Sequence, residues 1–163
     1  MLLDQMLLPL FEALEASAIG EAIRGSLWLF PVIEAFHLLG LAVIGGAVLV
    51  VDFRMLGLGL RGSAVARLAR DMQPWIVGSV VVMFASGVPL FLSEAIKCYY
   101  SFAFWVKMTA LLLALVFTFT IRRSVTAAPE GRHSPATYRI VALASLCLWS
   151  LVGWGGRWIG FSG

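Results

Sequence analysis

Four long apolar runs, separated by short polar segments, constrain this chain more than any other feature of its sequence. Each run is about 20 residues long, the length that an α-helix needs to cross the hydrocarbon core of a bilayer. Because 61% of the 163 residues are hydrophobic, we expect a single membrane domain, residues 1–163, with no separate soluble domain. The expected spans are about 27–51, 74–92, 102–121 and 140–161.

The pattern within the runs selects helices over strands. Backbone polar groups in lipid must be hydrogen-bonded internally, so only helices and closed barrels cross membranes. Barrel strands alternate apolar and polar residues, and these runs do not. The sequence therefore predicts an all-α fold, an integral membrane four-helix bundle.

The twelve Lys and Arg residues are unevenly distributed, and this predicts the orientation of the bundle. Cytoplasmic loops carry an excess of Lys and Arg, so we expect residues 52–73 and 122–139 in the cytoplasm. Both termini and residues 93–101 then lie outside, in a bacterial inner membrane. The net charge of +3 comes from these loops and gives no indication of nucleic-acid binding. Eight cations lie in the two loops: Arg54, Arg61, Arg67, Arg70, Arg122, Arg123, Arg132 and Arg139.

Residues 1–25 show helical periodicity before the first span. Apolar and acidic residues lie on different faces, which predicts an N-terminal amphipathic helix at the membrane interface. It would serve as an anchor or as a lid over the outer mouth of the bundle. The apolar positions are Leu3, Leu7, Leu10, Phe11, Leu14 and Ala18, and the polar ones Asp4, Gln5, Glu12, Glu15 and Glu21.

Cysteine and tryptophan leave several interpretations open. Cys98 is expected in the outer loop, as a metal ligand or a reactive thiol, and Cys147 inside the fourth span as a packing residue. Trp149 and Trp154 lie deeper in the fourth span than the other tryptophans. They are expected to pack in the bundle or to stack on a ring-shaped ligand.

Four ionisable side chains fall inside the predicted spans: Glu34, His37, Lys107 and Arg157. Each is costly in hydrocarbon, so such groups usually face the bundle interior and mark function. All four lie in the predicted outer half, where antiparallel packing can bring them together. We expect nothing comparable in the inner half, and no second acid within the membrane.

The types of these residues suggest a cofactor site. Glu34 and His37 have i, i+3 spacing, and a carboxylate can orient an imidazole whose other nitrogen binds a metal. We therefore predict His37 as a metal ligand, with Glu34 behind it and Lys107 and Arg157 holding the propionates of a haem. The iron would be five-coordinate, or a second axial ligand would come from a Met, from Lys107 or from His37 of another protomer. The alternative is a buried salt-bridge network that only locks the helices.

Several segments carry a resemblance to known proteins. Residues 26–42 (SLWLFPVIEAFHLLGLA), the pair Gly45-Gly46 and the segments 51–54, 103–107 and 156–159 resemble an uncharacterised bacterial family of four-span membrane proteins. More loosely, the chain is similar to copper-resistance protein D and to HemJ-type protoporphyrinogen oxidases. The HemJ resemblance implies haem binding by His37 and Lys107, although the third span has no His after Lys107.

The sequence suggests several functions. The first is a b-type haem or related redox protein that exchanges electrons with quinone or a periplasmic partner. One alternative is a transporter for copper or a small solute, which would use His37, Glu34 and a Met such as Met83 or Met108. Another is an accessory or anchoring subunit of a larger complex. An enzyme acting on a lipid-soluble substrate is a fourth, with its catalytic residues unknown. We expect the protein to be a homo-oligomer or a subunit of a larger membrane complex.

Overall fold

The chain is mostly helical in the part that its computed structural model describes, residues 2–60, 62–129 and 131–161. No strand occurs among these residues. The long helices are α3 (Leu29–Leu56), α4 (Val65–Ser93), α6 (Phe102–Phe117) and α8 (Pro135–Ile159). A π-helix, η1 (Thr118–Arg122), and α7 (Arg123–Ala127) continue α6. Three shorter helices complete the described chain: α1 (Leu2–Glu15), α2 (Ala18–Arg24) and α5 (Ala95–Tyr100).

Four helical stretches are long and apolar enough to cross a membrane: Leu29–Leu56, Val65–Ser93, Phe102–Ala127 and Pro135–Ile159. They confirm the predicted all-α four-helix bundle and make the chain a multi-pass membrane protein. Each helix continues beyond its predicted span into the predicted Arg-rich loops. Hydropathy falls at the first charged residue, whereas the backbone stays helical until a residue such as Gly57, at φ +79°, ends it.

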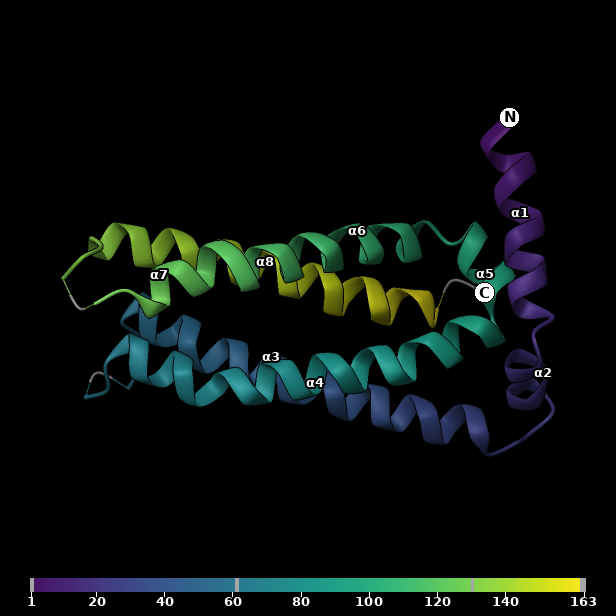
Figure 1. Ribbon diagram of the computed structural model, residues 1–163, viewed down its shortest axis with the longest axis horizontal. Helices are drawn as coiled ribbons and strands as arrows, with labels where there is room; N and C mark the ends of the chain where they lie inside the picture. Colours follow the sequence, from purple (N-terminus) through teal and green to yellow (C-terminus); the bar gives the residue numbers. More distant parts are fainter. Residues whose placement is uncertain (1, 61, 130, 162–163) are drawn as a thin grey trace.

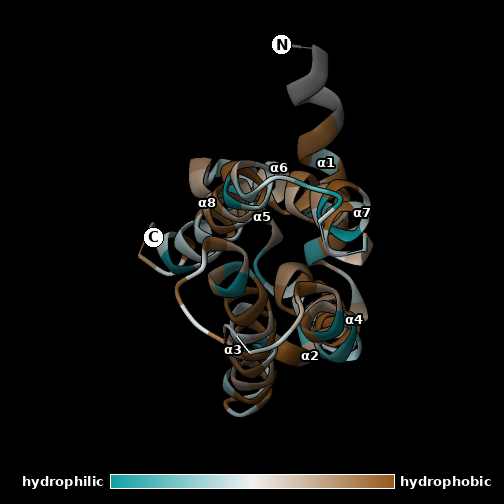
Figure 2. Ribbon diagram, turned by 90° about the vertical axis from the view of Figure 1, so that its left-hand side faces the viewer, coloured by the Kyte–Doolittle hydropathy of each residue, from teal (hydrophilic) through white to brown (hydrophobic). Residues whose placement is uncertain are grey.

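The spanning helices pack as two pairs, and Figure 1 shows α3 beside α4 and α6 beside α8. Contacts between α3 and α8 join the pairs. Figure 2 gives the view along the bundle, with the four helices grouped around a common axis. We call the end that carries α5 the α5 end and the opposite one the α7 end.

Small and β-branched side chains form the core. Ile44, Val48, Ile76, Ala114 and Val152, from all four spans, are at most 1% exposed. A second cluster lies further toward the α7 end and contains Val51, Met55, Val65, Val125, Val141 and Ala142. Such residues allow close helix approach, which supplies the van der Waals contact that holds helices together in lipid.

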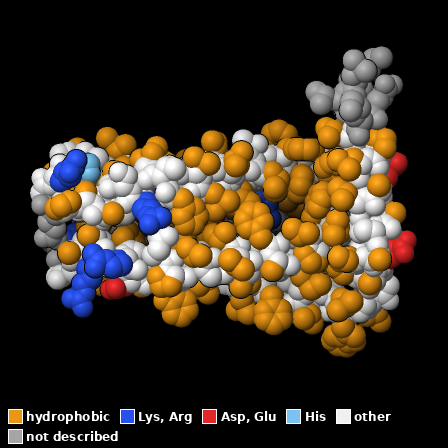
Figure 3. All heavy atoms as spheres, viewed as in Figure 1, with side chains coloured by type: hydrophobic (Ala, Val, Ile, Leu, Met, Phe, Trp, Pro, Cys, Tyr) orange, Lys and Arg blue, Asp and Glu red, His pale blue; other side chains and the backbone are white. Residues whose placement is uncertain are grey.

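The outer surface of the bundle is apolar along its sides. Figure 3 shows hydrophobic side chains over the middle, most Lys and Arg toward the α7 end, and Asp and Glu at both ends. Leu39, Val81 and Leu112, for example, are more than 60% exposed. A hydrophobic surface of this extent indicates a lipid environment.

The N-terminal region forms two helices in place of the single one predicted. Figure 1 shows α1 lying across the α5 end, at a steep angle to the long helices. Ser17 separates α1 from α2 and caps α2 by accepting a hydrogen bond from the amide of Gly20. The interfacial location of this region remains a prediction. The side chains of Leu3, Asp4 and Gln5 and residue Arg61, all named in the sequence predictions, lie outside the described residues.

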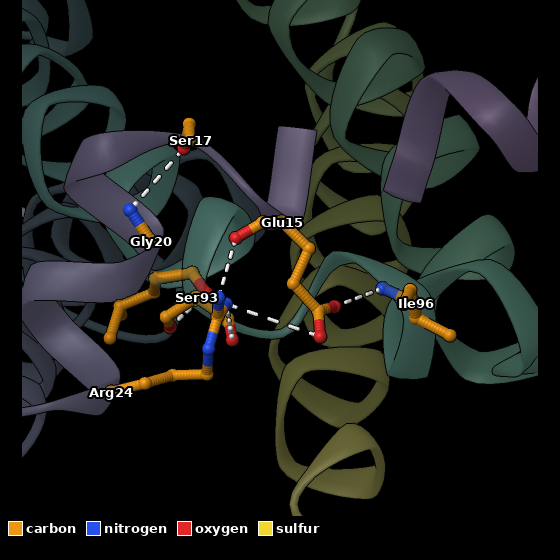
Figure 4. A network of polar contacts seen from close by, with 7 residues as sticks. Glu15, Ser17, Gly20, Arg24, Ser93 and Ile96 are labelled. Carbon is orange, nitrogen blue, oxygen red and sulfur yellow. Dashed lines mark hydrogen bonds and ion pairs between the residues drawn. The ribbon is translucent and has the colours of Figure 1, made fainter. Parts of the chain in front are cut away.

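Polar contacts fasten α1 and α2 to the bundle, as Figure 4 shows. The Arg24 guanidinium donates to the Ser93 carbonyl at 3.2 Å and to the Glu15 carbonyl at 2.7 Å. The Glu15 carboxylate in turn accepts from the Ile96 amide at 2.6 Å. These bonds connect the N-terminal helices to the corner between α4 and α5.

Candidate functional site

A cavity of about 240 Å³ lies among the four spanning helices, in the half of the bundle toward the α5 end. Its lining comes from all four: His37 from α3, Met83 and Gly87 from α4, Lys107 from α6 and Trp149 from α8. The rest of the lining is aliphatic or aromatic apart from the thioether of Met108. Apolar cavities with a few convergent polar groups are the usual form of a ligand site.

Ser86 determines which nitrogen of His37 is free. The Ser86 hydroxyl donates its one proton to the Val82 carbonyl at 2.6 Å, so it accepts from His37 Nδ1, which lies 2.9 Å away. In the neutral ring, Nδ1 then carries the proton and Nε2 keeps its lone pair. This arrangement leaves Nε2 able to bind a metal or to accept a proton.

Gly87 makes room for the His37 ring. A Cβ atom at this position would lie 3.1 Å from His37 Cε1, closer than ordinary packing allows. The Ser86-Gly87 pair on α4 thus supplies both the hydrogen bond and the space that hold the imidazole.

Lys107 enters the same cavity from α6. Its stem packs against α8, where a Cβ at Gly155 would lie only 3.0 Å from Lys107 Cβ. Among the described residues, no carboxylate or other hydrogen-bond partner is within reach of Lys107 Nζ. An ammonium in such surroundings favours an anionic or carbonyl ligand, because its charge is otherwise uncompensated.

Glu34 and Arg157 do not line the cavity, so the structure brings together only two of the four predicted site residues. Both side chains are exposed. The Arg157 guanidinium carbon lies 4.6 Å from the centre of the Phe161 ring. Residues three apart differ by about 60° around a helix, so His37 can face α4 while Glu34 faces outward. Both lie within two turns of a helix end, where a charged side chain can reach the membrane surface.

The other half of the bundle holds a buried ion pair, contrary to the prediction. Arg122 Nε lies 3.0 Å from Asp52 Oδ1, and Arg122 Nη2 donates to the Val48 carbonyl at 3.3 Å. Asp52 is 0% exposed and Arg122 3%. The expectation of no second acid within the membrane was therefore wrong. The sequence contained one sign of this pair. Asp52 and Arg122 each follow an apolar run with no Gly or Pro between, so both helices can continue through them.

The π-helix links this ion pair to the cavity. Arg122 ends η1 and Thr118 begins it. The buried Thr118 hydroxyl accepts a hydrogen bond from Trp149 Nε1 at 3.1 Å, and Trp149 lines the cavity. π-Helical turns are frequent at functional sites. Trp154, the other deep tryptophan, is exposed on α8.

The two cysteines are placed differently from the predictions. Cys98 is buried in α5 and Cys147 is exposed on α8, so Cys147 is not the interior packing residue expected. Burial raises the pKa of the Cys98 thiol to about 11, with a smaller contribution from the nearby Glu94 carboxylate. A thiol with this pKa is protonated and unreactive at neutral pH. Within the described part of the chain, no three His, Cys, Asp or Glu residues form a metal-binding group.

The fold and the cavity define a class, the multi-pass four-helix membrane proteins with ionisable groups between their spans. The chain belongs to a family of unknown function (DUF6644), whose family model matches residues 10–162. This agrees with the predicted membership of an uncharacterised family. No match was found among curated proteins, and none among solved structures. The looser likeness to copper-resistance protein D and to HemJ-type proteins has no support from these comparisons and stays a prediction.

Proposed function

We propose that this protein binds a b-type haem in the cavity and takes part in membrane electron transfer. One observation carries the proposal: the His37 imidazole, bonded through Nδ1 to Ser86, and the Lys107 side chain face the same apolar cavity. His37 would ligate the iron through Nε2, and Lys107 would hold a propionate. Glu34 and Arg157 lie outside the cavity, so they have no direct role in this proposal.

The donor types suit such a group, and the cavity of about 240 Å³ would have to widen to hold the whole macrocycle. Met83 and Met108 also line the cavity, and a Met thioether together with an imidazole is a known axial pair for haem iron. When bound, haem supplies one-electron exchange. The protein's part is to fix the His37 ring through Ser86, to neutralise the acidic edge through Lys107 and to exclude water with apolar walls. These features govern cofactor affinity and redox potential.

We further propose the orientation and partners that the charge distribution favours. The α7 end would face the cytoplasm of a bacterial inner membrane, with both termini outside. The cavity then lies in the outer half of the bilayer. Its electrons would pass to or from a membrane quinone or a periplasmic redox partner, with the protein acting as a homo-oligomer or within a larger complex.

An absorption spectrum of the protein purified in mild detergent from cells supplied with haem precursor tests this function. We expect a Soret band that shifts on reduction with dithionite and is lost in His37→Ala. His133→Ala is the matched control, because His133 lies in the segment before α8 and does not line the cavity. A colourless wild-type protein, or a His37→Ala variant with full haem content, would contradict the proposal.

Copper(I) binding is the second candidate, favoured by the presence of His37, Met83 and Met108 around one cavity. Thioether and imidazole ligands suit this ion. The unpaired Lys107 ammonium opposes it, because a cation beside a second cation is destabilised. If the purified protein has no Soret band, metal analysis distinguishes the remaining possibilities. Bound copper would support this candidate, and its absence would indicate that the buried groups serve helix packing alone.

A further inference from the structure

The wall of the cavity is open between α4 and α6. Phe84 and Val88 on α4 and Met108 on α6 line the cavity, yet each is 41–51% exposed on the bundle surface. Side chains that are both lining and exposed mark a gap in the wall. The main contacts of α4 and α6 are with α3 and α8 respectively, and little packing joins α4 to α6 midway. All three side chains are hydrophobic, so the opening faces lipid.

The route from the cavity to the α5 end is filled by aromatic rings. Phe91 and Phe104 both line the cavity, and their rings stack at 5.5 Å with an angle of 11°. Phe11 of α1 is 6% exposed and meets the edge of Phe91, with ring centres 5.5 Å apart. The stack separates the cavity from the surface on which α1 lies.

The N-terminal helices hold this aromatic stack in place. The Arg24 and Glu15 bonds shown in Figure 4 fix α1 and α2 against Ser93 and Ile96, at the end of α4 that carries Phe91. Phe11 also contacts Tyr99 and Trp105, with ring centres at 5.3 Å and 6.0 Å. Access from the aqueous side would require these contacts to separate.

We infer that the ligand of this cavity enters and leaves through the bilayer, between α4 and α6. The ligand class is a lipid-soluble molecule with a flat apolar ring system and an oxygen acceptor that Lys107 engages. Haem carries such an acceptor on its propionates and a quinone carries one on its carbonyls. This inference rests on the proposed haem binding and adds the route by which the ligand enters. The route itself can be tested without haem.

The first experiment uses apoprotein in nanodiscs with haemin dissolved in the lipid. In Val88→Trp an indole occupies the opening, so we expect Soret growth to slow about tenfold or more. Val81→Trp is the matched control, because Val81 is an exposed valine on α4 that does not line the cavity; its rate should equal that of wild type. Phe11→Ala should leave the rate unchanged. Faster uptake in Phe11→Ala, with no effect of Val88→Trp, would overturn the inference.

The second experiment keeps the route testable if wild-type protein binds no haem, a result that would refute only the proposed function. Leu111 lines the cavity and is replaced by Cys in a Cys98→Ala, Cys147→Ala background. Because a thiol in an apolar cavity holds little thiolate, labelling is followed for hours at pH 9, with the denatured protein as the reference for complete reaction. We expect labelling by lipid-dissolved N-phenylmaleimide, protection by Val88→Trp but not by Val81→Trp, and no labelling by a sulfonated maleimide. Equal labelling by both reagents, or no protection by Val88→Trp, would show that the cavity opens to water or elsewhere.

Discussion

At the scale of single residues, one hydroxyl on α4 determines the chemistry of His37. Because the Ser86 hydroxyl donates its hydrogen bond to the Val82 carbonyl, its oxygen accepts one from His37 Nδ1. The sequence singled out His37, which lines the cavity, and assigned the orienting role to Glu34, which does not. Spacing along one helix suggested that pair, whereas the actual partner comes from another helix. Contacts between helices depend on helix rotation, which periodicity alone does not define.

Removing the Ser86 hydroxyl should weaken ligand binding at His37. We expect Ser86→Ala to reduce haem affinity by about 10–100-fold, because groups that orient a ligating His have effects of this size. Ser79→Ala is the control: Ser79 is also buried on α4 and donates to the carbonyl four residues before it, but its hydroxyl bonds to backbone only and not to His37. The measurement is a haemin titration followed by Soret absorbance. Equal affinity of both variants would show that Ser86 does not position His37.

Cys98 gives a prediction of pH dependence. Because burial raises the pKa of its thiol to about 11, the thiolate is the disfavoured form in the folded protein. At pH 8, Cys98 should carry about two orders of magnitude less thiolate than a free cysteine. The stabilising contribution is complete below the unfolded pKa of about 9 and is lost as pH rises through about 11.

Alkylation by iodoacetamide checks this in a Cys147→Ala background. The rate should stay low at pH 8 and increase steeply above pH 10, with a free thiol as reference. Thermal unfolding over the same range should show stability falling more in wild type than in Cys98→Ala. A Cys98 that reacts like free cysteine at pH 8 would contradict the assignment.

At the scale of the helices, charge within the membrane is tolerated by pairing. Hydropathy predicted the four spans and their order, because length and apolar content suffice for that. Hydropathy placed the end of the first span at Val51 and that of the third at Ile121, because charged residues such as Asp52 and Arg122 are typical of loops. Hydropathy averaged along the sequence counts each charged residue as unfavourable in the membrane. The ion pair between the two helices lowers that free-energy cost. Such compensation depends on residues 70 positions apart and is not visible in a local pattern.

The Asp52–Arg122 pair should therefore be essential as a pair. Arg122→Ala leaves a buried carboxylate without its partner, a change that typically costs about 3–5 kcal/mol. Arg123→Ala is the matched control, since Arg123 is the next residue and is exposed. The double variant Asp52→Asn, Arg122→Gln should lose less stability than Arg122→Ala alone.

Unfolding in detergent, followed by circular dichroism as denaturant is added, measures these differences. The interpretation would be wrong if Arg122→Ala and Arg123→Ala unfold at the same midpoint. If haem is bound, the Soret spectrum of Arg122→Ala provides a second reading. A changed spectrum at unchanged haem content would show that η1 transmits the ion pair to Trp149 through Thr118.

At the scale of the whole molecule, charge and aromatic packing give the bundle two different ends. Most Lys and Arg lie toward the α7 end, and the acidic N-terminal helices cover the α5 end (Figure 3). The cavity with His37 and Lys107 is displaced toward the α5 end, so orientation decides which compartment its chemistry serves. The sequence predicted the charge asymmetry and the half that holds His37 and Lys107. It did not predict the α4–α6 opening, which results from how helices pair.

Orientation can be measured with cysteines placed at the two ends in a Cys98→Ala, Cys147→Ala background. Leu27→Cys lies beyond the α5 end and is 91% exposed, while Ala136→Cys lies at the exposed start of α8 at the α7 end. The positive-inside rule predicts that a membrane-impermeant maleimide labels Leu27→Cys in intact cells, and Ala136→Cys only after permeabilisation. The reverse pattern would place the cavity in the cytoplasmic half of the bilayer. A periplasmic partner would then be excluded, whereas a quinone dissolved in the membrane would still reach the opening between α4 and α6.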